Sequence, residues 1–98
     1  MEESLQRLIE WDENKNRINK VKHGVDFREA AKVFEDTFRL EEIDEAHSDE
    51  ELRYITIGRV NDVLFVVYTE RGDFTRLISA RRATKRERVK YLCQSLEF

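Results

Sequence analysis

Three closely spaced runs of β-forming residues constrain the fold of this chain more than any other feature. They occupy residues 53–60, 63–70 and 74–82, and apolar or β-branched residues fill the middle of each run. Asn61-Asp62 separates the first two runs, and Arg71-Gly72-Asp73 separates the second from the third. Because connections this short join antiparallel neighbours, we predict an antiparallel sheet with charged residues at the strand ends.

A first helix is predicted before these strands, from about residue 12 to residue 22. Asp12 suits the N-cap, and Gly24 suits the left-handed position that ends a helix. Helical spacing places two stripes on this helix. Asn14, Ile18, Val21 and Val25 mark one side, and Lys15, Asn19 and Lys22 mark a second stripe, with His23 four residues after Asn19.

A second helix is predicted from Asp26 to about residue 36, because Asp26 and Glu29 have the spacing of a capping box. Its buried residues should be those spaced along one helix face, namely Phe27, Ala30, Ala31 and Phe34. Residues 37–44 have the looser pattern of an edge strand, and the acidic residues 45–51 are predicted to form a solvated connection.

The C-terminal part is predicted to form a last helix, which begins at a capping box of Thr84 and Glu87. Its apolar stripe should pack on the sheet through Val89, Leu92, Cys93 and Leu96. The predicted fold is therefore α+β: two N-terminal helices, a three- to four-stranded antiparallel sheet and a C-terminal helix. Residues 8–11 are expected to be a short extended piece that directs Ile9 and Trp11 to one side.

The length of 98 residues suits a single domain over residues 1–98, with residues 1–7 expected to be flexible. The one cysteine excludes an internal disulfide, and neither a signal-peptide core nor a run of about 20 apolar residues is found. We therefore expect a cytoplasmic protein outside the membrane. The sequence also lacks a glycine-rich phosphate loop and metal-binding Cys/His spacing, so nucleotide and zinc binding have no support.

Charge is distributed unevenly along the chain, although its net value is only −3. Residues 41–51 contain seven acids and no lysine or arginine, whereas residues 70–90 contain eight basic residues and three acids. A local excess of positive charge can hold an anion whatever the sign of the whole molecule. The basic segment is therefore a candidate anion-binding surface.

Strand alternation predicts which of these charges share a face of the sheet. It places Leu77, Ser79 and Arg81 on one face, and on the other face Phe74, Arg76, Ile78, Ala80 and Arg82. Arginine offers paired donors that match a phosphate, so converging arginines could hold an RNA backbone. The alternative is a solvated charged rim without a ligand.

Two residues are candidates for proton transfer, and each also has a structural interpretation. His23 could act as acid or base near neutral pH, or could cap the end of its helix. Glu70 could be a general base, or could pair with an arginine. His47 is expected to be a surface residue in the acidic connection, and Cys93 a packing residue of the last helix.

Several ordered blocks resemble the BrnT toxins of bacterial type II toxin-antitoxin systems over about residues 8–92. The blocks are Glu10-Trp11-Asp12-Glu13-Asn14-Lys15, Lys22-His23-Gly24-Val25, Ala30-Ala31-x-Val33-Phe34, Ile57-Gly58-Arg59, Thr69-Glu70-Arg71-Gly72 and Ile78-Ser79-Ala80-Arg81. The resemblance implies a RelE-like fold and metal-independent ribonuclease activity. It also implies neutralisation by a BrnA-like antitoxin of ribbon-helix-helix type, through which alone the toxin would reach operator DNA.

Carried over to this chain, the resemblance implies a site without metal or cofactor. Its expected catalytic residues are His23, Glu70, Arg71 and Arg81, and its expected RNA-binding residues are Lys15, Asn19, Lys22, Arg59 and Arg82. The leading hypothesis is an endoribonuclease in which a ribose 2′-hydroxyl attacks the adjacent phosphate, with His23 or Glu70 as base. The alternative hypothesis is a non-catalytic basic module that only binds an acidic or DNA-binding partner protein.

Overall fold

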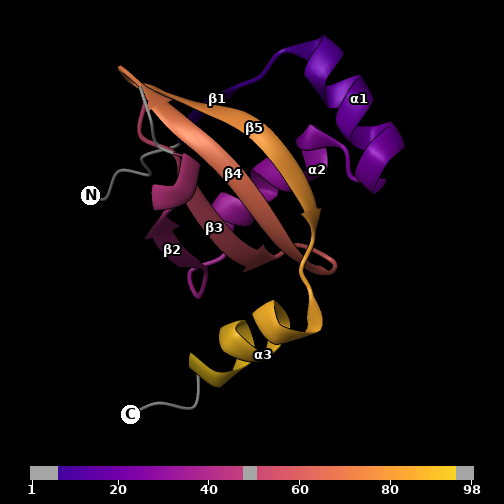
Figure 1. Ribbon diagram of the computed structural model, residues 1–98, viewed down its shortest axis with the longest axis vertical. Helices are drawn as coiled ribbons and strands as arrows, with labels where there is room; N and C mark the ends of the chain where they lie inside the picture. The colour runs from indigo at the N-terminus through magenta and orange to yellow at the C-terminus, as the bar shows by residue number, and fades with distance from the viewer. Residues whose placement is uncertain (1–6, 48–50, 95–98) are drawn as a thin grey trace, which may run out of the picture.

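The computed structural model describes residues 7–47 and 51–94, and Figure 1 shows the arrangement of their elements. In chain order, these elements are β1 (Leu8–Glu10), α1 (Glu13–His23), α2 (Phe27–Ala30), the 3₁₀ helix η1 (Ala31–Glu35), β2 (Leu40–Ile43), the 3₁₀ helix η2 (Glu45–His47), β3 (Tyr54–Arg59), β4 (Val63–Arg71), β5 (Phe74–Arg82) and α3 (Lys85–Gln94). The strands form one sheet in the order β1-β5-β4-β3-β2.

The α+β class is confirmed, but the predicted three- to four-stranded antiparallel sheet is wrong in two details. The sheet has five strands, and it is mixed because β1 pairs with β5 in parallel. The meander β3-β4-β5 and the edge strand β2 agree with the prediction. A strand of three residues carries too little pattern to predict its partner or direction, so the sequence revealed only that residues 8–11 are extended.

The two connections of the meander differ slightly from their prediction. Residues 60–62 connect β3 to β4, one residue more than the predicted Asn61-Asp62 hairpin. Gly72 lies in the turn between β4 and β5 with a φ of 60°, a left-handed conformation that glycine adopts without steric cost.

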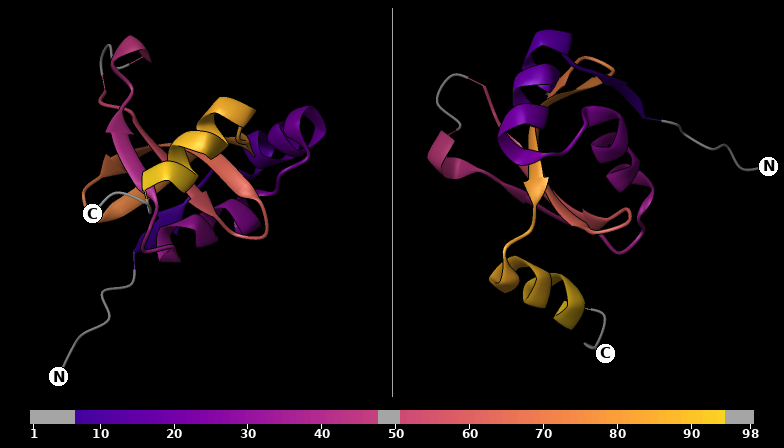
Figure 2. Two further views of the ribbon diagram at one scale, coloured as in Figure 1. Left: turned by 90° about the horizontal axis from the view of Figure 1, so that it is seen from below. Right: turned by 90° about the vertical axis from the view of Figure 1, so that its right-hand side faces the viewer.

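The sheet has one covered face and one largely open face, and Figure 2 shows α2 and α3 on opposite sides of it. On the covered face, α2 and η1 bury Phe27 and Val33 against side chains of β4 and β5, including Val66, Tyr68 and Leu77. Ile9 and Trp11 pack against the same core, as predicted. On the opposite face α3 contributes Tyr91 to a smaller cluster with Ile57 and Val63. The remainder of that face is available for a site.

Helix α1 begins and ends as predicted, and the residues buried along it are asparagines. Asp12 caps it at the N-terminus, and Gly24 ends it with a φ of 74°. Its buried residues are Asn16 and Asn19, whereas Ile18 and Val21 are 56% and 86% exposed. Helix α1 is held to its neighbours by hydrogen bonds of asparagine side chains rather than by aliphatic packing.

The predicted second helix is one α-helical turn, α2, followed by η1. Asp26 accepts a hydrogen bond from the backbone N–H of Arg28, so its capping role is confirmed. Phe27 and Ala30 are fully buried, and Ala31 and Phe34 are partly buried.

Helix α3 has the predicted capping box but not the predicted packing. The Thr84 N–H donates to the Glu87 carboxylate, and the Glu87 N–H donates to the Thr84 hydroxyl. However, Val89 and Leu92 are about half exposed and Cys93 is exposed, while Tyr91 is the buried residue. Helix α3 contacts the open face of the sheet through Tyr91, the one aromatic residue that anchors it there. Leu96 lies outside the described residues.

A β-bulge in β5 changes the predicted faces of that strand. Val67 pairs with Ser79 and Tyr68 pairs with Leu77, which leaves Ile78 as an extra residue. Leu77 and Ala80 are buried in the core, whereas Ile78 and Ser79 both border hollows on the open face. The prediction that Leu77 shares a face with Arg81 is therefore wrong.

Among the helices in the described part of the chain, none is long and apolar enough to cross a membrane.

Candidate functional site

Two adjacent hollows lie on the open face of the sheet, and Ile78 and Ser79 border both of them. One, of about 180 Å³, lies between β5 and α1; the other, of about 350 Å³, extends over β4 and β3 toward η2. Together we call them the open-face groove, and we define it by its basic and imidazole side chains: Lys15, Lys22, His23, His47, Arg53 and Arg81. The bulge creates the shared floor because it turns two successive residues of β5 to this face.

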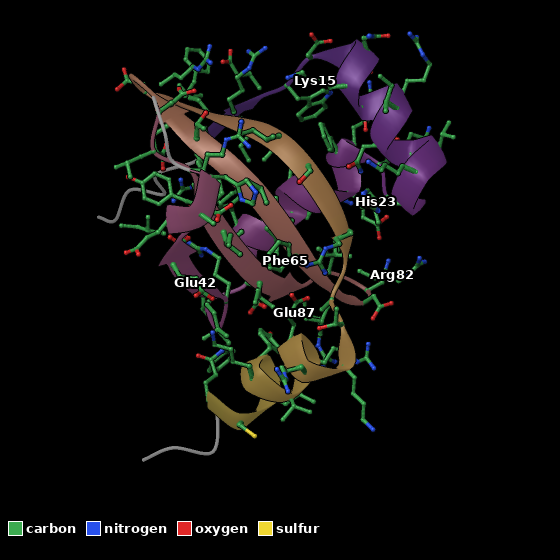
Figure 3. The ribbon with its side chains drawn as sticks, viewed as in Figure 1. Lys15, His23, Glu42, Phe65, Arg82 and Glu87 are labelled. Atoms are coloured by element: carbon green, nitrogen blue, oxygen red, sulfur yellow. The ribbon has the colours of Figure 1, made fainter. Side chains whose placement is uncertain are left out.

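Helix α1 supplies one wall of the groove. Lys15, Lys22 and His23 border the smaller hollow, and Figure 3 shows Lys15 and His23 on the helix beside β5. His23 is half-buried in the last turn of α1, next to the left-handed Gly24. The Lys22-His23 end of α1 therefore lies beside Ile78 and Ser79 of β5.

Asn19 belongs to the structural support of this wall. Its side-chain amide donates to the carbonyls of Val25 and Ala80, both at 2.9 Å, and its oxygen accepts from the Ala80 N–H at 3.1 Å. The residue is 5% exposed, and both amide hydrogens have partners inside the protein. The structure thus gives Asn19 a role in joining α1 to β5, and its contact with RNA stays a prediction.

Arg81 lies at the other end of the groove in a defined geometry. Its guanidinium makes two hydrogen bonds to the Glu87 carboxylate, at 2.8 and 3.0 Å. The guanidinium carbon lies 3.9 Å from the centre of the Phe65 ring, a cation–π contact. The hydrogen bond from Arg81 holds the pKa of Glu87 below its ordinary value, so the pair stays charged at neutral pH.

The groove is electropositive although the whole chain is acidic. Among the residues that the structure describes, its lining combines two lysines, two arginines and two histidines with one carboxylate, that of Asp44. A carboxylate oxygen of Asp44 lies 3.1 Å from Nδ1 of His47. This contact orients the imidazole through Nδ1 and does not involve Nε2. Such a surface suits a polyanion with several phosphates.

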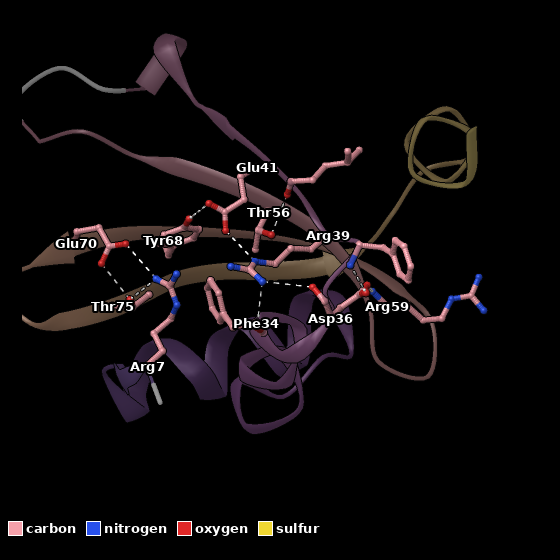
Figure 4. Close-up of polar contacts among 12 residues, drawn as sticks. Arg7, Phe34, Asp36, Arg39, Glu41, Thr56, Arg59, Tyr68, Glu70 and Thr75 are labelled. Atoms are coloured by element: carbon pink, nitrogen blue, oxygen red, sulfur yellow. Dashed lines mark hydrogen bonds and ion pairs between the residues drawn. The ribbon is translucent and has the colours of Figure 1, made fainter. Parts of the chain in front are cut away.

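Glu70 and Arg71, two of the four predicted catalytic residues, lie away from the groove. Glu70 is on the helix-covered face at the far end of β4, where it pairs with Arg7 at 3.1 Å and accepts from the Thr75 hydroxyl (Figure 4). Arg71 pairs with Glu51 beside the β4–β5 turn. Seven residues of β5 separate this turn from Arg81, which corresponds to about 20 Å. The structure brings His23 and Arg81 to one groove but does not bring Glu70 or Arg71 there.

Arg59 and Arg82 also lie outside the groove. Arg59 borders a separate cavity of about 600 Å³ between η1 and α3, and its backbone N–H donates to Asp36. Arg82 pairs with Asp62, although its guanidinium comes close to Gly24 at the end of α1. Both arginines flank the candidate site instead of lining it.

Asp36 and Tyr91 form a polar centre in that separate cavity. Their side chains are 2.5 Å apart in a hydrogen bond that the tyrosine donates. Burial and the neighbouring carboxylate raise the pKa of Tyr91 to about 12. Burial would raise the pKa of Asp36, but hydrogen bonds from Tyr91 and from two backbone N–H groups lower it below the ordinary value. This hydrogen bond ties α3 to the loop after η1.

The sequence analysis missed four residues that shape the groove: Phe65, Ser79, His47 and Arg53. Ser79 was visible as a neighbour of Arg81, but the bulge that exposes it leaves no simple pattern in the sequence. Phe65 was assigned only to a strand, and Glu87 was assigned only to a helix cap. The spacing of six residues between Arg81 and Glu87 gives no sign that they pair across a turn.

Comparisons with protein families and with solved structures each gave a match. The sequence model of the family described as "Ribonuclease toxin, BrnT, of type II toxin-antitoxin system" matches residues 11–87. Among solved structures, the crystal structure of the Brucella abortus ribonuclease toxin BrnT matches with a TM-score of 0.62 and 26% identity. That match covers 82% of this chain and 100% of the Brucella chain. A search of curated proteins found no match.

The family match extends over most of the chain and includes α1, the whole sheet from β2 to β5 and the start of α3. It therefore includes every residue that defines the open-face groove. The resemblance inferred from sequence blocks is confirmed: the chain belongs to the BrnT family of ribonuclease toxins of type II toxin-antitoxin systems.

Proposed function

We propose that this toxin is an endoribonuclease that binds RNA in the open-face groove and cleaves it by attack of a ribose 2′-hydroxyl on the adjacent phosphate. The observation that carries the proposal is the convergence of Arg81 with the Lys22-His23 end of α1 on one electropositive groove. This convergence supplies both a group for the developing charge of the phosphate and a group for proton transfer.

Arg81 would stabilise the negative charge that develops on the phosphate as the new bond forms. Lys15 and Lys22 would hold the flanking phosphates, which fixes the RNA along α1. His23 would accept the proton of the attacking 2′-hydroxyl. With His23 as base, the reaction needs no metal ion, because side-chain cations supply the charge.

His47 is the candidate for the second proton transfer, to the leaving 5′-oxygen. It borders the larger hollow, and its contact with Asp44 fixes the orientation of its ring. A pair of histidines, one as base and one as acid, should give a bell-shaped dependence of the rate on pH. Glu70 is the alternative base from the sequence analysis, but its pairing with Arg7 on the other face favours a structural role.

The test is incubation of the purified chain with RNA in excess EDTA. We expect new ends that carry a 2′,3′-cyclic phosphate and a 5′-hydroxyl, and a loss of about 100-fold or more in rate for Arg81→Ala. Arg28→Ala is a matched control, because Arg28 is an exposed arginine that pairs with Glu13 and lines neither hollow of the groove. Activity of His23→Ala combined with loss in Glu70→Gln would transfer the role of base to Glu70.

The second candidate function is a non-catalytic basic module, and the same preparation separates it from the first. A folded chain that leaves RNA intact, yet binds its antitoxin, would support the module and overturn the nuclease proposal. RNA binding should also weaken steeply between about 50 and 200 mM salt, because phosphate contacts release counterions.

We propose that the antitoxin is a BrnA-like ribbon-helix-helix protein that covers the open-face groove with acidic side chains. Operator DNA would then be bound by the antitoxin alone. The charge of the groove supports an acidic partner segment. Added antitoxin should abolish RNA cleavage, and Lys22→Glu in the toxin should weaken the complex.

A further inference from the structure

We propose that Glu87 and Phe65 are positioning residues for Arg81, which they hold with one bidentate edge free to bind the phosphate at which RNA is cleaved. This inference rests on the proposed function of the groove. It concerns two residues that contact the arginine and would act through it.

The donors of the Arg81 guanidinium divide into an occupied set and a free set. Both hydrogens of Nη1 are used, one by the Glu87 carboxylate and one by the carbonyl of Arg82 at 3.2 Å. Nη2 gives one hydrogen to the other Glu87 oxygen. In the part of the chain that the structure describes, Nε and the second hydrogen of Nη2 have no hydrogen-bond partner. These two form one edge of the planar group, and an edge of this kind matches two oxygens of a phosphate.

The free edge belongs to a side chain that is held on two sides. The Phe65 ring covers one face of the guanidinium at 3.9 Å, and the Glu87 carboxylate occupies the neighbouring edge formed by Nη1 and Nη2. Arg81 and Phe65 both border the larger hollow. The guanidinium therefore has one well-defined orientation in which a ligand in the groove can meet its donors.

Glu87 is itself fixed, which distinguishes it from an ordinary surface partner. Its Oε1 accepts from the Thr84 N–H at 2.8 Å, and its own N–H is bonded to the Thr84 hydroxyl, so the first turn of α3 holds the carboxylate (Figure 3). Its side chain is 21% exposed. A capped helix thus presents a rigid carboxylate to the arginine, and a rigid support reduces the cost of ordering Arg81 when phosphate binds.

An opposite role for Glu87 is conceivable, in which the carboxylate competes with phosphate for Arg81. The geometry favours positioning, because the two edges of the guanidinium can be occupied at the same time. The two roles predict opposite effects on the rate of RNA cleavage. Loss of the Glu87 charge lowers the rate if Glu87 positions Arg81, and raises the rate if Glu87 competes with phosphate.

The decisive variant is Glu87→Gln, whose oxygen can still accept from the Thr84 N–H but whose amide nitrogen cannot accept from Arg81. We expect kcat to fall about 10- to 100-fold, as for other supporting groups, while KM for RNA changes little. Glu42→Gln is the matched control, because Glu42 also pairs with a residue of α3, Lys90, without contacting Arg81. The control should retain its rate within about twofold.

Two further measurements make the test independent of helix stability. Phe65→Leu keeps an apolar contact but removes the cation–π face, and should lower kcat in a chain whose melting temperature is monitored in parallel. In an Arg81→Lys background, which lacks the planar fork, Glu87→Gln should cost nothing further. An unchanged or increased rate in Glu87→Gln, or an equal loss in both backgrounds, would overturn the inference.

Nuclear magnetic resonance can observe the free edge directly. A mixed-sequence 2′-O-methyl RNA oligonucleotide, which lacks the attacking hydroxyl, should shift the Nε–H signal of Arg81, identified by its absence in Arg81→Lys. No shift on saturation would contradict the inference. If wild-type protein cleaves RNA but this signal does not move, the inference alone fails. If the signal moves but no cleavage occurs, the proposed nuclease function alone fails.

Discussion

Asn19 takes the place of a neighbouring strand for part of β5. The parallel pairing with β1 covers Phe74 to Arg76, and no other strand in residues 7–47 and 51–94 lies beside the outer edge of β5 at Ala80. The Asn19 amide binds both the N–H and the carbonyl of Ala80, as a backbone partner would. A side chain from α1 thereby satisfies a buried edge and fixes the helix that carries Lys22 and His23.

Replacement of this residue should therefore affect stability before it affects RNA binding. Asn19→Ala leaves buried backbone groups of Val25 and Ala80 without partners, and we expect a loss of about 3 kcal/mol in the free energy of unfolding. Chemical denaturation measures this loss. Asn14→Ala, on the exposed side of the same helix, should change stability by less than about 0.5 kcal/mol. Unchanged stability together with weaker RNA binding would restore the role predicted from sequence.

At the scale of elements, the close approach of η1 to β3 depends on Gly58. A Cβ at this position would stand 2.5 Å from Cγ2 of Val33 and 3.1 Å from Cβ of Arg39. Real atoms do not approach so closely, so any side chain here would push η1 away from the sheet. The close packing of η1 on β3 thus explains the glycine in the Ile57-Gly58-Arg59 block.

This contact gives a prediction about the two elements together. Gly58→Ala should destabilise the protein by about 1 to 3 kcal/mol through overpacking. Val33→Ala removes the nearest obstructing atom, so the double variant should be more stable than the sum of the single effects predicts, by about 1 kcal/mol. Equilibrium unfolding of the wild type, the two single variants and the double variant measures this coupling between Gly58 and Val33. Strictly additive losses would show that the steric contact is relieved elsewhere.

At the scale of the whole molecule, carboxylates that accept hydrogen bonds join separate parts of the fold. Asp26 accepts from the Arg28 N–H and from Asn16, and these bonds, with Lys20 nearby, lower its pKa to about 2. Asp36 and Glu87 also have pKa values below the ordinary range. The three carboxylates hold α1 to α2, η1 to β3 and α3 to β5.

These lowered pKa values predict how the stability of the fold declines at acidic pH. A carboxylate with a lowered pKa in the folded state stabilises the fold above the unfolded value near 4, and this stability is lost as the pH falls through the folded value. The melting temperature should therefore fall steeply between about pH 4 and pH 2. Circular dichroism melts measure it. Asp26→Asn should flatten the fall, whereas Asp73→Asn in the exposed β4–β5 turn should follow the wild type; identical curves for all three would contradict this assignment.

The sequence by itself determined the local structure: the three strands of the meander, the caps of α1 and α3 at Asp12, Gly24 and Thr84, and the family. These features depend on residues close together in the chain, whose spacing follows the helical or strand repeat. Features that depend on residues far apart in the chain were predicted less well. The parallel pairing of β1 and the exposure of Val89 on α3 depend on contacts between distant segments.

Only the tertiary structure decided which candidates form one site. Strand alternation placed Leu77 with Arg81 and Ile78 with Ala80, but the extra residue in β5 puts Leu77 in the core and Ile78 at the groove. The sequence also left the distances from His23 to Glu70 and to Arg81 open, because no local pattern shows which end of the β4–β5 hairpin the end of α1 approaches. The fold separates Glu70 from the other two and pairs Arg81 with Glu87, since sheet register and the turn into α3 fix positions that no local repeat encodes.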